Sequence, residues 1–467
     1  MLGQQATRLS HFLNKLQRPH KQWRRGISFS PFRSESPATV QDFNFRFATG
    51  GGREGKFFSM FAVGGIACFG CILSSGLKKE DSTLVCDSDL SSLHSKESQD
   101  VRRLVDSLQA NFLLSLQSIQ VPAEQFTDAG VDRKNATEWN GIAWKRDNGV
   151  HGGGIRYQQV DSPLFHRATI NVSGVHYEDK ENYPIDSATA LSVILHPKHP
   201  HAPSMHFHIS YVENRNKKKE NYWRMIADLN PGIPNADDTK KFQSTFKYVS
   251  HLQPTLLRDA LEFGNMYFYI PALRRHRGAS HLFIGNLNAK DMSKTKCKEL
   301  AEDLAQKTIK VYSEIVQNAI NTNPIEKLTR EDYRKQFHFH TVYFFQVLTL
   351  DRGTTHGLLA HGDNDVGTLG SLPNFVSKSL LRQWLELMEC NVQRKLLEEI
   401  IGVLPQEVEI NGLKGSVVDD DVRGQLANVI RSHYRSNRGA TSKQAKLDLS
   451  WWAEQREKRL HLDTVKA

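Results

Sequence analysis

The chain has 467 residues, of which 39% are hydrophobic and 24% are charged. This is the composition of an ordinary folded protein, long enough for one large or two medium domains. Most of the net charge of +10 lies near the N-terminus, because residues 1–60 hold ten Lys and Arg against three Asp and Glu. The other residues carry only +3 in total, so the charge gives no reason to expect a nucleic-acid partner.

The cysteines predict no disulfide framework. There are five, an odd number, and they show no paired spacing in the body of the chain. Cys68 and Cys71 form a Cys-x-x-Cys, but they lie inside an apolar run. Cysteine as a small apolar residue is therefore favoured there over a redox or zinc motif.

The N-terminal region is typical of a mitochondrial presequence. Residues 1–55 are rich in Arg, Ser and aromatic residues and poor in acids. An apolar sorting or anchor segment, residues 56–78, follows, and its Phe57–Leu77 run has 21 residues without a charge. At ~1.5 Å per residue a helix of this length would just span a bilayer. A polar linker, residues 79–100, completes an order that predicts delivery to the mitochondrial intermembrane space or inner membrane, with cleavage and retention of the anchor both open.

The hydrophobic period then changes from helical to alternating. Helical spacing covers Val101–Ile119, and a period of two begins after Trp139. Strands joined by Gly, Pro, Asp and Asn turns predict an antiparallel sheet. The predicted strands include residues 152–155, 168–175, 188–195 and 205–212, with Lys217–Glu220 as a hairpin loop. Helical spacing returns at residues 239–248, 256–264, 293–320 and 376–403.

Strands grouped together, with helices available to cover a face, predict an α+β fold with a broad antiparallel sheet flanked by helices. We place this domain at residues 101–404. Residues 405–467 form a mixed-charge C-terminal extension, whose one apolar spot is Ser450-Trp451-Trp452. Such a tail is usually a docking helix or disordered.

The segment Ser192–Glu213 concentrates the candidate chemistry. Its prolines fix three φ angles within seven residues, which predicts a stiff loop. After the loop, apolar residues alternate with His206 and His208, so on a strand the two imidazoles share one face, ~7 Å apart. A metal site, structural histidines and general acid/base work all remain open. The sequence offers no further cluster of ligands, so we expect no metal.

Ser192–Phe207 closely resembles a segment of the oxygen-dependent coproporphyrinogen III oxidases, which reads Ser-Val-Ile-His-Pro-Lys-Asn-Pro-His-Ala-Pro-Thr-x-His-Phe. The resemblance extends over roughly residues 141–385 in the same order and with nearly gapless spacing. It is also carried by Gly152–Ile155, Thr169–His176, Trp223–Pro231, Tyr267–Ile270, Arg277-Gly278, Asp351–Leu358 and Ser371–Pro373.

This resemblance implies oxidative decarboxylation of two propionates of coproporphyrinogen III, which gives protoporphyrinogen IX in haem biosynthesis. It implies molecular oxygen as co-substrate with no metal or organic cofactor, and a homodimer. The apolar segment 56–78, and not the resemblance, leaves the inner mitochondrial membrane open as a further partner. The implied catalytic residues are His206, as proton donor, and Asp228, facing the pyrrole N–H groups. The implied substrate-binding residues are Ser192, His208, Arg277, Arg352 and Gly362. For Arg352 a structural ion pair with Asp351 or another acid is the alternative.

The sequence departs from the family pattern at demanding positions. Three glycines have become Arg224-Met225-Ile226, and two arginines expected to bind propionates have become Ser210 and Asn364. Each lost charged hydrogen bond costs ~1.5–3 kcal/mol, unless Arg224, Lys241, Arg274 or Arg275 substitutes. An inert relative, acting as a tetrapyrrole-binding protein or a subunit of a mitochondrial inner-membrane complex, is therefore the second hypothesis.

Overall fold

The computed structural model describes residues 95–122, 138–181, 183–410, 412–437, 451–452 and 454–458. The predicted presequence and the apolar segment lie outside the described residues, as does the linker up to residue 94. Within the described ranges, no helix combines the length and the apolar character that crossing a membrane requires.

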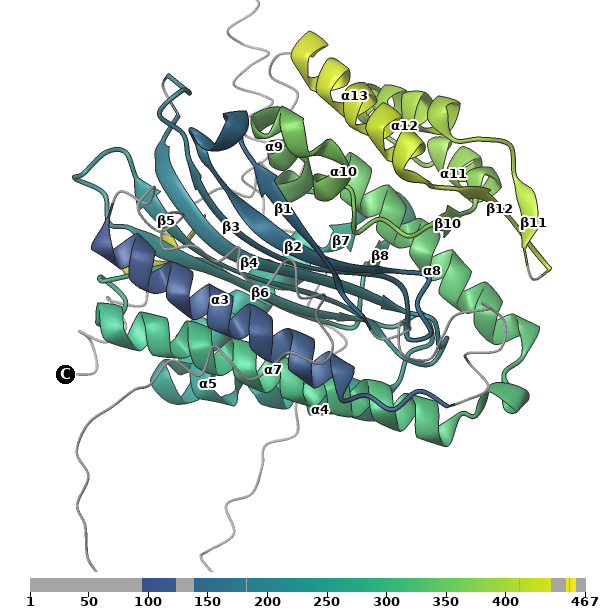
Figure 1. Ribbon diagram of the computed structural model, residues 1–467, viewed down its shortest axis with the longest axis horizontal. Coiled ribbons are helices and arrows are strands. Elements are labelled where there is room, and N and C mark those ends of the chain that lie inside the picture. The colour runs from purple at the N-terminus through teal and green to yellow at the C-terminus, as the bar shows by residue number, and fades with distance from the viewer. Residues whose placement is uncertain are drawn as a thin grey trace, which may run out of the picture. The chain divides into compact units, whose positions relative to one another are not determined.

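A seven-stranded antiparallel sheet forms the centre of the described structure (Figure 1). Its strands, in spatial order, are β1 (Asn140–Lys145), β2 (Gly152–Val160), β3 (Phe165–His176), β4 (Ile185–Pro197), β5 (Ser204–Asn214), β6 (Tyr222–Asn230) and β9 (Ser280–Asn288). The first six follow one another along the chain, as the alternating pattern and its turns predict. The predicted strands and the Lys217–Glu220 loop between β5 and β6 are confirmed.

One face of the sheet is apolar and covered by helices. On β5, Met205, Phe207 and Ile209 are at most 1% exposed and belong to the main core. They face α3 (Lys96–Gln117) and α7 (Lys294–Thr322), which lie along this side of the sheet (Figure 1). The rings of Phe112 on α3 and Phe207 lie 5.4 Å apart. Burial of alternate residues therefore directs the intervening polar residues to the opposite face.

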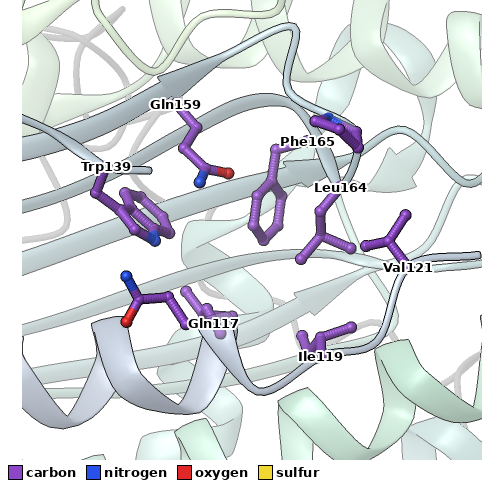
Figure 2. Close-up of a pocket in the computed structure, with 9 residues that line it drawn as sticks. Gln117, Ile119, Val121, Trp139, Gln159, Leu164 and Phe165 are labelled. Carbon is purple, nitrogen blue, oxygen red and sulfur yellow. The ribbon is translucent and has the colours of Figure 1, made fainter. Parts of the chain in front are cut away.

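A small apolar pocket opens where α3 ends beside the sheet. Ile119 and Val121 follow the helix, and Trp139, Leu164 and Phe165 lie across from them (Figure 2). Its polar lining is limited to two glutamine side chains, so it carries no acid, base or nucleophile.

Helices also lie on the opposite side of the sheet (Figure 1). They include α6 (Pro254–Tyr267), α8 (Arg330–Thr349), α9 (Arg352–Ala360) and α10 (Asp365–Thr368).

Shorter helices α4 (Ala236–Gln243) and α5 (Lys247–Leu252) replace the single helix predicted at residues 239–248. The hairpin of β7 (Tyr269–Ile270) and β8 (Arg275–His276) leads from α6 into β9.

A second core joins α8 to a C-terminal subdomain. This subdomain comprises α11 (Lys378–Leu385), α12 (Asn391–Val403), α13 (Asp420–Ser436) and a small sheet of β10 (Phe375–Val376), β12 (Leu413–Val417) and β11 (Val408–Ile410). The predicted helix at residues 376–403 is thus divided by a turn between α11 and α12. Leu404, Val418 and Leu426 all lie in this second core, so one apolar core spans both sides of the boundary predicted at 404/405.

The Trp451-Trp452 pair of the C-terminal extension docks onto α6 and β9. Trp452 is 1% exposed and lies 5.3 Å from the ring of Phe263. A Cβ on Gly285 of β9 would lie 2.1 Å from the indole nitrogen of Trp452, so only glycine leaves room for this ring. Arg456 forms an ion pair with Asp291 at 2.7 Å.

Replacing Phe207, the central aromatic residue of the covered face, tests how much that face contributes to stability. We expect Phe207→Ala to lower the free energy of unfolding by about 3–5 kcal/mol, because it leaves a cavity under α3. Urea denaturation measures this change. Val160→Ala, at a position 46% exposed, is the control and should change stability by less than about 0.5 kcal/mol. Equal effects of the two substitutions would contradict the assignment of faces.

Candidate functional site

The face of the sheet opposite α3 and α7 carries a row of polar side chains on three neighbouring strands. Strand register pairs His206 with Asp228 and His208 with both Ser192 and Ile226. Directly paired residues project to the same face of a sheet. The predicted sharing of one face by the two histidines is therefore confirmed, and Ser192 and Asp228 join them.

Asp228 is the most deeply buried charge of this row. Its side chain is 0% exposed and forms ion pairs with His206, at 2.9 Å, and with Arg277. The Asn230 side chain donates to it as well, at 2.7 Å. Burial alone would raise the pKa of Asp228, but the positive charges of Arg277 and His206 hold that pKa well below its usual range. Asp228 is therefore an ionised carboxylate whose visible acceptor positions are occupied.

This carboxylate fixes the orientation of His206. An ionised carboxylate can only accept hydrogen bonds, so the Nδ1 of His206 carries the hydrogen in this contact. The imidazole side chain is 18% exposed. No described residue forms a hydrogen bond with its Nε2. His206 thus presents an oriented nitrogen at the site face, which suits transfer of a proton to or from a bound molecule.

His208 is held as a neutral ring. Its Nδ1 lies 2.8 Å from the hydroxyl of Ser192, and its Nε2 lies 3.0 Å from the hydroxyl of Ser210. Burial, with the nearby charges of His206 and Arg224, lowers the pKa of His208 to about 3. Both ring nitrogens are engaged, so in this arrangement Ser192 and His208 form part of the floor of the site.

Arg277 takes a structural position beneath the site. It is 2% exposed, donates to Gln346 at 2.7 Å, and stacks over the ring of Phe268 at 4.2 Å from the centroid. Its charge is matched by Asp228. A direct contact with substrate would require this buried pair to open, so the geometry favours support of Asp228 over substrate binding.

Arg352 is the first residue of α9. The carboxylate of Asp351 accepts instead from the Thr354 backbone N–H, at 2.7 Å, and from the hydroxyl of Tyr267, at 3.1 Å. The structure shows no Asp351–Arg352 ion pair among its described residues. Gly362 is exposed in the short turn η6 (Gly362–Asn364), next to Arg431 of α13.

The three residues that replace the family's glycines divide between the two faces. Met225 is 0% exposed in the main core, whereas Ile226 and Arg224 pair with His208 and Ser210 on the site face. Bulk is thus added to the site at only two of the three positions.

Among the four basic residues considered as substitutes for the lost arginines, only Arg224 is placed on this face by its strand register. Lys241 pairs instead with Glu314 of α7 at 2.9 Å. Arg274 and Arg275 lie on the exposed β7–β8 hairpin.

Helix α9 and the turn η6 contribute residues that were not recognised from the sequence. The hydroxyl of Tyr183 lies 2.8 Å from a ring nitrogen of His356, and Arg156 on β2 donates to Asn364 at 3.1 Å. His356 lies four residues after Arg352, so it occupies the same face of α9. That spacing was the available signal, while its contact with Tyr183 depends on the tertiary structure.

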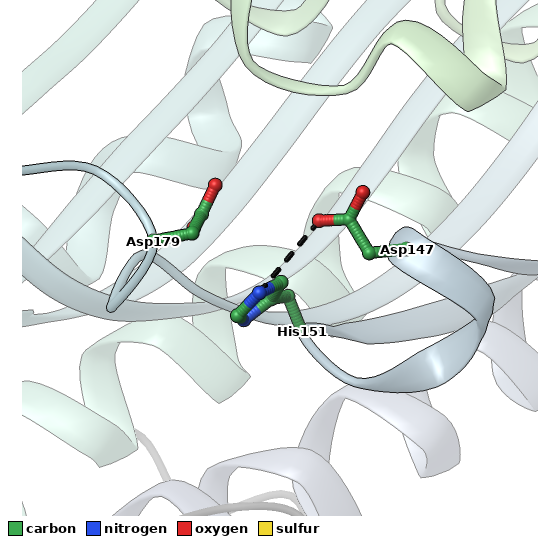
Figure 3. Close-up of side chains that lie close together, drawn as sticks. All are labelled: Asp147, His151 and Asp179. Carbon is green, nitrogen blue, oxygen red and sulfur yellow. Dashed lines mark ion pairs between the residues drawn. The ribbon is translucent and has the colours of Figure 1, made fainter.

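A group with metal-ligand chemistry lies at one end of the sheet. Ligand atoms of Asp147, His151 and Asp179 lie within 4.8 Å of one another (Figure 3). Arg146 and Lys180 also bind Asp179; although burial raises its pKa, these two cations lower it to about 2. The carboxylate charge is therefore already compensated by side chains. Asp179 lies 28 residues from His151, so these three residues form no recognisable spacing motif.

A broad antiparallel sheet with an aspartate-oriented histidine on its polar face defines an α+β protein with an acid/base site. The sequence profile of the family described as coproporphyrinogen III oxidase matches residues 100–384. The chain belongs to this family, and the predicted family and α+β fold are confirmed.

Individual relatives agree with this membership. The chain is 29% identical over 246 residues to the oxygen-dependent coproporphyrinogen-III oxidase of Rickettsia bellii, covering 50% of this chain and 82% of the relative. It is 27% identical over 284 residues to the mitochondrial enzyme of Rattus norvegicus, covering 56% and 60%. For the chloroplastic enzyme of Glycine max the identity is 28% over 244 residues, covering 47% and 60%.

The buried ion pair predicts a specific pattern of stability changes. Asp228→Asn leaves Arg277 charged and buried without a counter-charge, so we expect a loss of about 3–5 kcal/mol in the free energy of unfolding. Arg277→Met should cost a similar amount. The double variant should lose clearly less than the sum, because each side chain then has no stranded partner. Asp186→Asn, which removes the partner of the exposed Lys217, is the control and should cost at most about 1 kcal/mol.

Buried histidines predict loss of stability in acid. Burial is the main cause that lowers the pKa to about 3 for His196, His208, His281 and His356. In the unfolded chain they titrate near ~6.5, so below that pH the unfolded state binds more protons. Their contribution is complete above pH ~6.5 and falls by ~1.4 kcal/mol per pH unit per histidine as the pH drops towards the folded value. Urea denaturation at pH 7.5 and 5.5 measures the slope, which His208→Gln should make shallower.

Proposed function

We propose that this protein catalyses the oxygen-dependent oxidative decarboxylation of coproporphyrinogen III to protoporphyrinogen IX in haem biosynthesis. Family membership and the printed names of the relatives support this reaction. In each decarboxylation a propionate loses carbon dioxide and one hydrogen from the carbon next to the pyrrole, and so becomes a vinyl group. Molecular oxygen takes up the two electrons and two protons as hydrogen peroxide. The protein's task is to hold the flexible macrocycle, bind its carboxylates and move protons.

The observation that carries the proposal is the oriented imidazole of His206. Asp228 holds its Nδ1 at 2.9 Å, and the ring is partly exposed on the polar face of the sheet. We assign proton transfer to its Nε2. Asp228 acts through His206 as a positioning residue, since Arg277 and Asn230 already occupy the rest of its carboxylate. A pyrrole N–H contact with Asp228, as the resemblance implies, would require one of these partners to move.

Location, assembly and cofactor use complete the proposal. The basic, acid-poor first 55 residues and the rat relative support a mitochondrial location, with the intermembrane space or inner membrane as the finer proposal. Association with the inner membrane is proposed from the apolar segment 56–78. A homodimer and a reaction that uses oxygen without metal or organic cofactor are proposed from the family resemblance.

Turnover by the purified full chain tests the function. Coproporphyrinogen III, prepared anaerobically and then exposed to air with the protein, should give protoporphyrinogen IX, detected chromatographically as protoporphyrin after oxidation. His206→Gln should lower kcat by about 10²–10⁴-fold, because it keeps a polar side chain but removes the proton-transfer group.

The matched control is His251→Gln, at an exposed position of α5, which should keep full activity. Full activity of the His206→Gln protein would remove His206 from the chemistry. Absence of product from a folded wild-type chain would contradict the function and favour the inert tetrapyrrole-binding alternative.

A further inference from the structure

Two arginines at the site have no acidic partner among the residues that the structure describes. Arg224 projects from β6 on the same face as Asp228, and Arg352 begins α9. Neither forms an ion pair with any residue that the structure describes. By contrast, buried arginines elsewhere usually reach a carboxylate within 4.0 Å, as Arg102, Arg146, Arg167, Arg277 and Arg423 do. An uncompensated pair of partly buried guanidinium groups is therefore unusual in this fold.

The two charges act electrostatically on each other and on the same neighbour, Tyr183. Burial and then the charge of Arg224 lower the pKa of Arg352. Burial raises the pKa of Tyr183 to about 12, although Arg352 and Arg224 both oppose that rise. Two partly buried like charges, with no ion-pair partner among the described residues, favour the binding of an anion.

Tyr222 adds a donor to this group. It precedes Arg224 by two residues and projects to the same face of β6, with its ring 5.9 Å from the Arg224 guanidinium carbon. Tyr222 is 2% exposed, yet its hydroxyl forms no hydrogen bond with any described residue. A buried hydroxyl without a hydrogen-bond partner destabilises the folded state. An anionic oxygen of a ligand would supply the missing acceptor.

Strand register places Arg224 directly beside the position of the lost arginine. Ser210 stands where the family pattern places a propionate-binding arginine, and Arg224 is its direct cross-strand partner on β6. Such partners have Cβ atoms ~4.5–5.5 Å apart, well within the reach of an arginine side chain. On the other side of β6, a shift in register with β9 between Trp223 and Met225 leaves Arg224 without a paired residue. The guanidinium lost from one strand is thus regained on the next.

We propose that Arg224, Arg352 and Tyr222 form a carboxylate-binding site, in which Arg224 replaces the arginine lost at Ser210 and fixes one propionate of the substrate. The site departs from the family pattern, which has glycine in place of Arg224. A carboxylate suits it, since guanidinium groups bind carboxylates through two parallel hydrogen bonds. This assignment rests on the proposed function for the identity of its ligand, and on geometry for its chemistry.

Exchanging the residues at Ser210 and Arg224 tests whether Arg224 replaces the lost arginine. Arg224→Gly, the family residue, should raise KM for coproporphyrinogen III about 10- to 100-fold with little change in kcat, since a charged hydrogen bond to substrate is lost. The double variant Ser210→Arg, Arg224→Gly should recover most of that loss. Arg334→Gln, at an exposed pair on α8, is the control and should leave both constants unchanged. An Arg224→Gly protein with unchanged KM, or an exchange variant as impaired as the single one, would overturn the proposal.

Binding separates this proposal from the proposed function. The Kd of coproporphyrin III, followed by its fluorescence, should rise in Arg224→Gly by the same factor as KM. The Kd of its tetramethyl ester, which has no carboxylate charge, should stay constant. This measurement needs no turnover, so a wild-type chain without product would refute the reaction while the acid-selective loss still supported the carboxylate site. Equal loss for acid and ester would refute the site alone.

Discussion

The carboxylate of Asp228 is fully buried at the middle of this site. The contacts that compensate its negative charge hold the surrounding residues in place. Asp228 on β6 is bound by Arg277 from the loop before β9 and by His206 from β5. Leaving this charge unpaired in the interior would cost several kcal/mol. Its three partners, counting Asn230, fix the approach of β9 and the ring of His206 together. The contacts that compensate the buried charge of Asp228 therefore also orient His206, the candidate acid/base group.

One face of the sheet stabilises the fold, and the other face carries the candidate acid/base and binding residues. One face is filled with side chains that α3 and α7 exclude from water, and this burial sets the strand register. Once the register is set, the alternation of the strands brings His206, His208 and Arg224 to the other face. Departures from the family pattern can therefore be tolerated there, as Ser210 and Arg224 show, because exchanging polar groups between paired positions leaves the covered face unchanged.

The sequence predicted local structure well where a pattern has one physical meaning. Alternating residues on β2 to β5 and the amphipathic stripe of α3 reflect a single buried face, so both elements were placed correctly. Helix α8 was not predicted, since its aromatic and β-branched run Phe337–Thr349 has little helical propensity or amphipathic pattern. It is helical because its C-terminal half is buried on all sides between the sheet and the C-terminal subdomain. Propensity is overridden there by packing that no local window contains.

Residue order and the two-residue period of a strand were enough to predict the family, the α+β class and the shared face of His206 and His208. They also supplied Asp228, Arg352 and Arg224 as candidates. The roles of these residues depend on the folded structure: Arg277 pairs with Asp228, Arg352 forms no ion pair with Asp351, and Arg224 lies on the site face beside the position of the lost arginine. These outcomes depend on which partner each charge meets across strands and helices, and long-range pairing of charges leaves no periodic trace in a sequence.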